Sequence, residues 1–489
     1  MSTSEKAEKE EMRSHYNELL TALNTGEQES GPNDRRSSYL RLIGCAVFYL
    51  VFCFAFGVYI GSDSRGYIEM ISAREPVYPL FLALWRGIFG ESIYLWVVII
   101  LQNLLMAFCV WYCSEHLWKR FSKSRLILGG MYAVHAGVAF LCQFLAERGA
   151  IYSSNILTEG ITVSLWLLAM TLLIEGVLDW DKKKLVLLLL LLALLTDTRK
   201  QMAVGYPALA AAVFFGRMGK DGFKLWLKRV LLVVGGILLS LILALGGTRL
   251  YNYVLRGSFA ANTRDMNLVL TTTLYVADPE DASLIEEEAV RTLFERTMKE
   301  LDAKGSNYSY AGSGWSALEA HYEENFDRIT VDTTGPLFVD YAKERGFAEG
   351  MEAEGEADRM SLVIVKSLFF HNLGRYLKVY GASVLNGLIN TVAKRHPLLD
   401  IYAFAVFALL AVLTFLCYRN EESREAGRGS LFVLLGLLCN TAVAAALIFC
   451  QSRYMIYNMA LFYMALLWTG EAVIRRFKSG ATKNGNKKE

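Results

Sequence analysis

An acidic residue at the edge of a long apolar segment is the first feature of this sequence that could do chemistry. The apolar residues 39–60 end in Gly-Ser-Asp63-Ser, and a loop shaped by prolines follows through Pro79. Ionisable groups where a membrane span meets water are functional candidates, because keeping them there is costly. A partly desolvated Asp63 carboxylate could act as a general base. The alternative is a loop residue that only pairs with Arg65 or Arg74.

Glu159 is the second candidate acid, and it lies just before the apolar residues 161–180. Its carboxylate could assist Asp63 or bind the hydroxyl groups of an acceptor. It could equally satisfy the dipole at a helix N-terminus, with Thr158 as the N-cap residue. The sequence leaves both interpretations open.

Cationic residues at two other apolar boundaries are candidates for binding an anion. Arg199 and Lys200 follow a short apolar run, and Arg453 with Tyr454 separates two apolar segments near the C-terminus. Neighbouring cations at a membrane interface suit an anionic lipid headgroup, although Arg199 and Lys200 could also be snorkelling residues with Asp197 as their partner. Positive charge is disfavoured in outward loops, so we predict a phosphate or sugar contact for Arg453 and Tyr454.

The remaining polar residues in apolar segments fit structural roles. We assign such a role to His135, inside the third apolar segment, and to Glu175, near a helix end. No metal-ligand spacing, Ser-His-Asp arrangement, P-loop or GxGxxG motif is present, so we expect neither a metal nor a cofactor. The eight cysteines lie in or beside apolar segments and none falls within 251–397, so we expect no disulfide-stapled domain.

The composition predicts an all-α polytopic membrane protein. Hydrophobic residues form 54% of the 489-residue chain and charged residues 20%, and the mean hydropathy is +0.31. A soluble chain of this length would carry more charge and fewer long apolar runs. The formal net charge of +2 gives no indication of nucleic-acid binding, and we predict none. The expected spans, about ten, are 39–60, 92–117, 126–146, 161–180, 185–196, 203–216, 230–250, 400–418, 430–450 and 459–474.

Lysine and arginine gather in alternate connections between these spans, and the positive-inside rule places those connections in the cytoplasm. Both termini are then cytoplasmic, and the candidate residues share the outward side. We expect a short interfacial helix at 80–90 and a mainly helical outward insert. The predicted divisions are a polar segment 1–38, a transmembrane module 39–250, the extracytoplasmic insert 251–397, C-terminal transmembrane helices 398–477 and a basic cytoplasmic tail 478–489.

The order of these short motifs resembles the polytopic glycosyltransferases of the GT-C superfamily, and most closely the family 39-like group that uses dolichyl- or undecaprenyl-phosphate sugars. The first loop has Asp63 followed by Arg74-x-Pro-x-Tyr78-Pro, and later loops have Leu-Thr-Glu159-Gly, Thr-Arg199 and Ser-Arg453-Tyr. The resemblance covers most of the chain to about residue 250 and thins through 251–360.

The sequence also departs from that family in two ways. Family members often carry paired acids in the first loop, whereas Asp63 is followed by Ser64. The second acid is therefore open between Glu159, Asp197 and none. The Trp-Trp-Asp type of motif found in oligosaccharyltransferases is absent, which makes a peptide acceptor and an essential divalent metal less expected.

The resemblance implies an integral membrane glycosyltransferase that moves a sugar, with inversion, from a polyprenyl-phosphate donor to a glycan, lipid or protein acceptor on the extracytoplasmic face. Asp63 would be the base, with Glu159 as the candidate for a second catalytic carboxylate. The residues expected to bind the donor phosphate or substrate are Arg74, Tyr78, Arg199, Lys200, Arg453 and Tyr454. The expected location is the plasma membrane, with a bacterial origin favoured.

Two other functions fit some of the same residues. A transporter or flippase for a lipid-linked or anionic solute would also use cations at the membrane boundary, but it needs alternating access rather than a one-sided site. A structural subunit of an envelope-assembly complex would make Asp63 dispensable. The clustering on one side, the large insert and the lack of internal repeats favour the enzyme.

Overall fold

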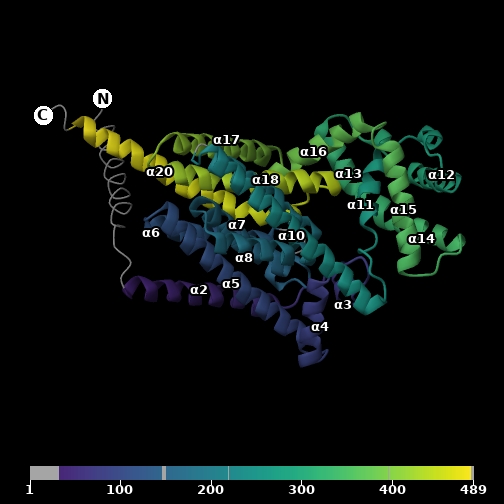
Figure 1. Ribbon diagram of the computed structural model, residues 1–489, viewed down its shortest axis with the longest axis horizontal. Helices are drawn as coiled ribbons and strands as arrows, with labels where there is room; N and C mark the ends of the chain where they lie inside the picture. Colours follow the sequence, from purple (N-terminus) through teal and green to yellow (C-terminus); the bar gives the residue numbers. More distant parts are fainter. Residues whose placement is uncertain (1–31, 146–149, 219, 395, 486–489) are drawn as a thin grey trace.

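The computed structural model describes residues 32–145, 150–218, 220–394 and 396–485 (Figure 1). Within these ranges the regular elements are all helices, apart from one isolated parallel bridge between Tyr59 and Asn155. The predicted all-α class is confirmed for this part of the chain.

Seven helices are long and apolar enough to cross a membrane, and each matches one of the predicted spans. They are α2 (Pro32–Phe56), α5 (Tyr94–Phe121), α6 (Arg125–Phe144), α7 (Glu159–Asp179), α10 (Phe223–Arg256), α17 (Pro397–Arg419) and α18 (Arg424–Leu447). The chain therefore has the helices of a multi-pass membrane protein.

The other three predicted spans are helices that do not meet the same standard. α8 (Lys182–Thr198) has 17 residues and α9 (Gly205–Arg217) has 13, below the roughly 20 residues that a perpendicular span needs. α20 (Met459–Gly485) is longer, but it carries charged side chains from Glu471 onward. The total of about ten spans remains a prediction.

α7 forms the centre of the bundle. Inside the molecule, 94% of its most apolar stretch is buried, against 17% for α2 and 22% for both α10 and α17. The outer helices expose many large apolar side chains, for example Leu231 and Ile242 on α10 and Phe415 on α17. Lipid would cover such faces, because a soluble protein rarely exposes apolar patches of this extent.

Residues between α10 and α17 form a helical insert with an apolar core of its own, which includes Leu274, Phe294 and Phe326. Figure 1 shows the insert at one end of the molecule, with the start of α2 and the end of α20 at the other. The helices of the insert are α11 (Asp265–Val276), α12 (Glu288–Ala303), α13 (Trp315–Ile329), α14 (Gly335–Glu344), α15 (Met351–Leu368) and α16 (Leu373–Val392).

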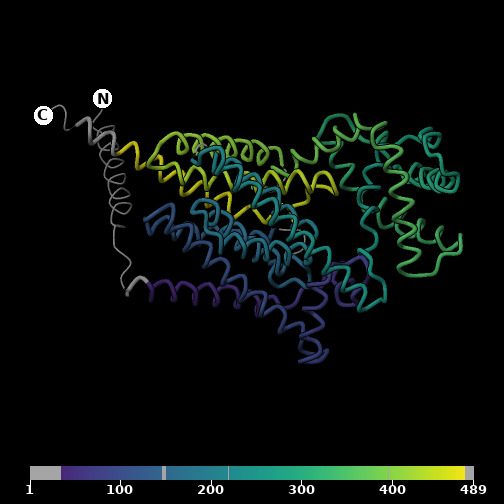
Figure 2. Tube along the Cα trace, in the orientation of Figure 1, coloured from purple at the N-terminus to yellow at the C-terminus, as the bar shows by residue number. Residues whose placement is uncertain are grey.

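The loop after α2 holds two short helices, α3 (Ser64–Ile68) and α4 (Val77–Phe89). α4 is the helix expected at 80–90, but it begins earlier because Pro79 is tolerated in a first turn, where backbone N–H groups have no helical partner. Figure 2 shows this loop beside the C-terminal end of α10, where the Arg256 guanidinium donates to the carbonyl of Met70. The end of the bundle nearest the insert thus receives the Asp63 loop.

Candidate functional site

Asp63 lies between two arginines that are far apart in the sequence. Arg74 Nη2 donates to Asp63 Oδ1 at 3.0 Å, and Arg453 Nη1 donates to Asp63 Oδ2 at 3.1 Å. The carboxylate side chain is 31% exposed, so it is accessible and partly desolvated at once. The structure therefore joins the first loop to the loop before the last helix.

The arginine contacts continue to the second candidate acid. Arg199 Nη1 forms an ion pair with Glu159 Oε1 at 2.8 Å, and Arg453 Nε lies 4.0 Å from the same oxygen. Arg74, Asp63, Arg453, Glu159 and Arg199 thus alternate in charge, and we refer to these five residues as the charge cluster. Its members come from four segments of the chain.

Aromatic rings support the arginines. The ring of Tyr454 has the Arg199 guanidinium 5.0 Å from its centroid and that of Arg453 at 4.8 Å, and its hydroxyl accepts from Arg453 Nη2 at 2.6 Å. Tyr67 lies 4.7 Å from the Arg74 guanidinium in the same manner. Such cation–π contacts hold the cations in place without neutralising them.

Tyr78 lies behind the cluster rather than in it. Its side chain is 0% exposed, its hydroxyl donates to Gln102 Oε1 at 2.9 Å, and its ring packs edge-on against Tyr67. In this structure Tyr78 is buried and supports Tyr67, and its binding of substrate stays a prediction.

Lys200 points away from Arg199, which separates the expected pair of cations. Its ammonium group pairs with Asp265 and lies 3.8 Å from Glu75, and 43% of its side chain is exposed. Arg199 has an extended backbone, and successive side chains point to opposite sides of an extended chain. Asp197 is not their partner in the described contacts, because its carboxylate accepts from the Thr248 hydroxyl at 2.9 Å.

Asp63 is held as a carboxylate by its arginines. Burial alone would raise the pKa of Asp63, but the charges and hydrogen bonds of Arg453 and Arg74 keep that pKa below its usual range. Asp63 is therefore ionised at neutral pH, and it is a weak base for as long as both arginines stay on it.

Thr158 does not cap α7 as the simpler interpretation of Glu159 requires. The Thr158 side chain makes no capping hydrogen bond, and its hydroxyl accepts from Arg199 Nη1 at 3.0 Å. Glu159 is 2% exposed and lies against both Arg199 and Arg453. Its position at the start of α7 suits the helix dipole as well, so the two interpretations describe the same side chain.

Two amides inside α5 hold the loop that carries Glu159. Gln102 Nε2 donates to the carbonyl oxygens of Ser153 and Asn155, both at 3.0 Å, and Asn103 Nδ2 donates to that of Ser153 at 3.1 Å. We did not single out this pair from the sequence. The signal was available, since Gln-Asn interrupts an otherwise apolar helix and buried amides require partners.

Asp327 on α13 is a further residue that we did not predict from the sequence. Partial burial raises the pKa of Asp327, the charge of Arg453 opposes that shift, and the charge of Asp63 adds to it. These mutual effects place Asp327 near the cluster. Nothing in the sequence singled it out, because it lies in the insert, where the family resemblance is thin.

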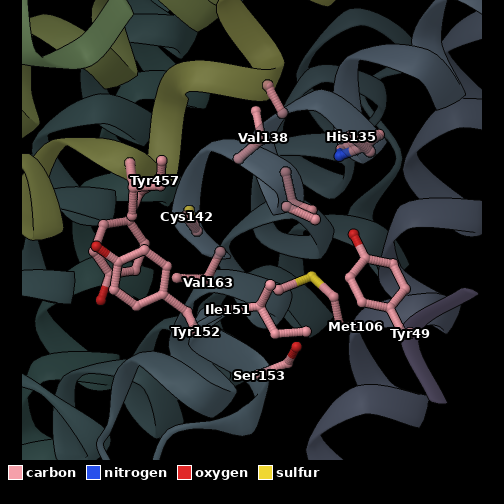
Figure 3. A pocket seen from close by; sticks show the side chains of 14 residues that line it. Tyr49, Met106, His135, Val138, Cys142, Ile151, Tyr152, Ser153, Val163 and Tyr457 are labelled. Carbon is pink, nitrogen blue, oxygen red and sulfur yellow. The ribbon is translucent and has the colours of Figure 1, made fainter. Parts of the chain in front are cut away.

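A mainly apolar cavity of about 40 Å³ lies among α2, α5, α6, α7 and the start of α20. Figure 3 shows Tyr152 and Tyr457 on one side of it and Tyr49 with Met106 on the other. Its size suits water or a small apolar group. His135 is buried at its wall, which agrees with a structural role.

Glu175 belongs to an ion-pair group at the other end of α7. Its two carboxylate oxygens contact His116 Nδ1 and Lys184 Nζ, each at 2.9 Å. The structural role expected for Glu175 fits these contacts.

Comparisons of the chain with protein-family models, with curated proteins and with solved structures found no match.

Proposed function

We propose that the protein is an integral membrane glycosyltransferase that moves a sugar, with inversion, from a polyprenyl-phosphate donor to an acceptor hydroxyl. One observation carries the proposal: an accessible carboxylate, Asp63, shares its two oxygens between Arg74 and Arg453. A base and cations for a phosphate leaving group are thereby present in one cluster, beside the insert.

The donor phosphate would bind the guanidinium groups of Arg74 and Arg453, since arginine pairs with phosphate through two parallel hydrogen bonds. That binding takes both partners from Asp63, and the pKa of the carboxylate then returns upward. Asp63 accepts the proton of the acceptor hydroxyl, and the oxygen attacks the anomeric carbon from the face opposite the phosphate. The bond between that carbon and the phosphate oxygen breaks, and its electron pair leaves with the lipid phosphate.

Arg199 and Glu159 would act indirectly, through Arg453, rather than on the substrate. The Glu159 carboxylate lies against Arg199 and Arg453. It thereby holds Arg453, which contacts Asp63 and would bind the donor phosphate. Preorganised cations stabilise the charge that develops on the leaving phosphate, without cost of reorganisation during the reaction. We assign Glu159 a positioning role.

The cluster and the insert would face the extracytoplasmic side of a plasma membrane, with both chain termini in the cytoplasm. The placement of the insert opposite the described ends of α2 and α20 supports this orientation (Figure 1). A bacterial envelope fits a donor of this class. The acceptor would be a glycan, a lipid or a protein.

The proposal is tested with purified protein in liposomes, a panel of radiolabelled polyprenyl-phosphate sugars and a mixed pool of acceptors. We expect transfer from one donor class, and a product whose anomeric configuration, read by NMR, is opposite to that of the donor. A product of retained configuration would contradict the mechanism. The absence of transfer from every donor would favour a transporter or flippase.

A further inference from the structure

The insert is bonded directly to the loop that carries Asp63. Glu354 of α15 accepts hydrogen bonds from the hydroxyls of Ser72 and Thr263, both at 2.6 Å, and from Arg264 Nη2 at 2.9 Å. Its side chain is only 12% exposed. Ser72 is two residues before Arg74, so a carboxylate of the insert holds the loop next to a member of the charge cluster.

The backbone is strained in both segments that meet at this contact, at Met70 in the Asp63 loop and at Arg264 in the insert. Met70 and Arg264 have φ values of 56° and 65°, and they are two of the three non-glycine residues with positive φ in the described ranges. Residues with side chains keep such conformations only where their surroundings impose them, and these conformations concentrate at functional and switching segments. Here the Arg256 guanidinium holds the carbonyl of Met70, and Glu354 holds the side chain of Arg264.

Lys200 provides a second connection between the same two segments. Its ammonium group pairs with Asp265 at the start of the insert, and it lies 3.8 Å from Glu75 in the loop. Loop and insert are therefore joined on either side of Arg74, through Ser72 and through Glu75.

We propose that Glu354 is a positioning residue that couples the insert to the charge cluster. While Glu354 holds Ser72, the loop presents Asp63 and Arg74 to Arg453. Release of Glu354 lets the loop move away and separates Asp63 from Arg453. Binding of the acceptor to the insert would act on Asp63 by this route, a consequence for catalysis that rests on the proposed function, whereas the coupling itself does not.

Hydrogen exchange of the full-length protein in detergent tests the coupling without any assumption about the reaction. In Glu354→Ala, we expect amides of 62–76 to exchange about tenfold faster, because the loop loses the short charge-assisted hydrogen bond from Ser72. Ser72→Ala is a milder variant that should accelerate the same amides. The matched controls are Glu352→Ala on the same helix and Ser62→Ala in the same loop, and both should leave the exchange unchanged.

Two further variants separate coupling from a general loss of stability. Glu354→Gln keeps an oxygen for the hydroxyl groups and should restore part of the protection. The double variant Ser72→Ala/Glu354→Ala should open the loop no further than Glu354→Ala alone, since both remove the same contact. Unchanged exchange of 62–76 in Glu354→Ala and Ser72→Ala would overturn the proposal.

The transfer assay then distinguishes the two proposals. Faster exchange together with a lower kcat and a raised KM for the donor, both partly restored in Glu354→Gln, would support coupling to catalysis, because the displaced loop carries Asp63 and Arg74. Faster exchange in a protein that transfers no sugar would retain the coupling and reject the proposed function. Normal exchange with normal transfer would reject the coupling and retain the function.

Discussion

Asp63 is both placed and restrained by its arginines. Each carboxylate oxygen has one guanidinium partner, so the pKa of Asp63 lies below its usual range and the resting carboxylate accepts a proton poorly. In the proposed reaction, a donor phosphate that binds the two arginines would reverse this effect. The base of that reaction would therefore become effective only when the donor is bound.

The lowered pKa of Asp63 predicts a pH dependence of stability with a definite sign. A carboxylate with a folded-state pKa below its unfolded value, about 3.9, stabilises the protein above that value and loses this effect as the pH falls through the folded pKa. Asp63→Asn should lower the apparent Tm at pH 7. The difference from wild type should shrink as the pH falls below about 4. A difference that grows in acid would contradict the assigned direction of the shift.

Single residues were predictable where their partner was near in sequence. Arg74 was one of two expected partners for Asp63, and the Arg65–Glu69 ion pair fits the spacing of one helical turn. Arg453 meets Asp63 across 390 positions, a contact that no local pattern contains. The opposite directions of Arg199 and Lys200 depend on one extended residue, which the charges alone do not show.

At the scale of elements, the rigid part of the site is the packing of α5 against the loop before α7. Gln102 and Asn103 hold that loop, and the bridge of Tyr59 with Asn155 joins it to the end of the first span. Backbone hydrogen bonds on both sides of the bridge, from Tyr59 N to Ser154 O at 3.1 Å and from Ile156 N to Tyr59 O at 3.0 Å, fix their relative position. These contacts thereby fix the segments that carry Asp63 and Glu159 relative to each other.

Gln102→Leu should disturb these contacts while preserving the volume of the side chain. The carbonyl oxygens of Ser153 and Asn155 would each lose one of two donors, keeping Asn103 Nδ2 and the Tyr78 hydroxyl, and Tyr78 would lose its acceptor Gln102 Oε1. Each hydrogen bond lost in this way costs about 0.5–1.5 kcal/mol. We expect a lower apparent Tm in detergent and a clear fall in transfer. An unchanged Tm with normal transfer would show that the amide does not support the site.

The elements themselves were predictable to different extents. The apolar segments located all seven long helices, because length and hydropathy are properties of each segment alone. The start of α4 was misplaced by three residues, since prolines that suggest a loop are also compatible with a first turn. α8 and α9 were predicted as spans, but their 17 and 13 residues make them shorter than a full span.

At the scale of the whole molecule, the protein consists of a helical bundle and an insert, each with its own apolar core. The charge cluster lies where the two meet, and α13 brings Asp327 into the electrostatic range of Asp63. The insert could be recognised as polar and mainly helical from the sequence. Its contacts with the Asp63 loop depend on pairs such as Ser72 and Glu354, which are 282 residues apart.

The most direct test of the proposed chemistry compares sugar transfer by wild type and Asp63→Asn at equal protein in liposomes. Asp340→Asn is the matched control, because this aspartate is exposed and its described ion pair is with Lys343, far from the cluster in sequence. We predict a loss of at least about 100-fold in Asp63→Asn, with donor binding retained, and no change in the control. Equal transfer by Asp63→Asn and wild type would contradict the assignment of Asp63 as the base.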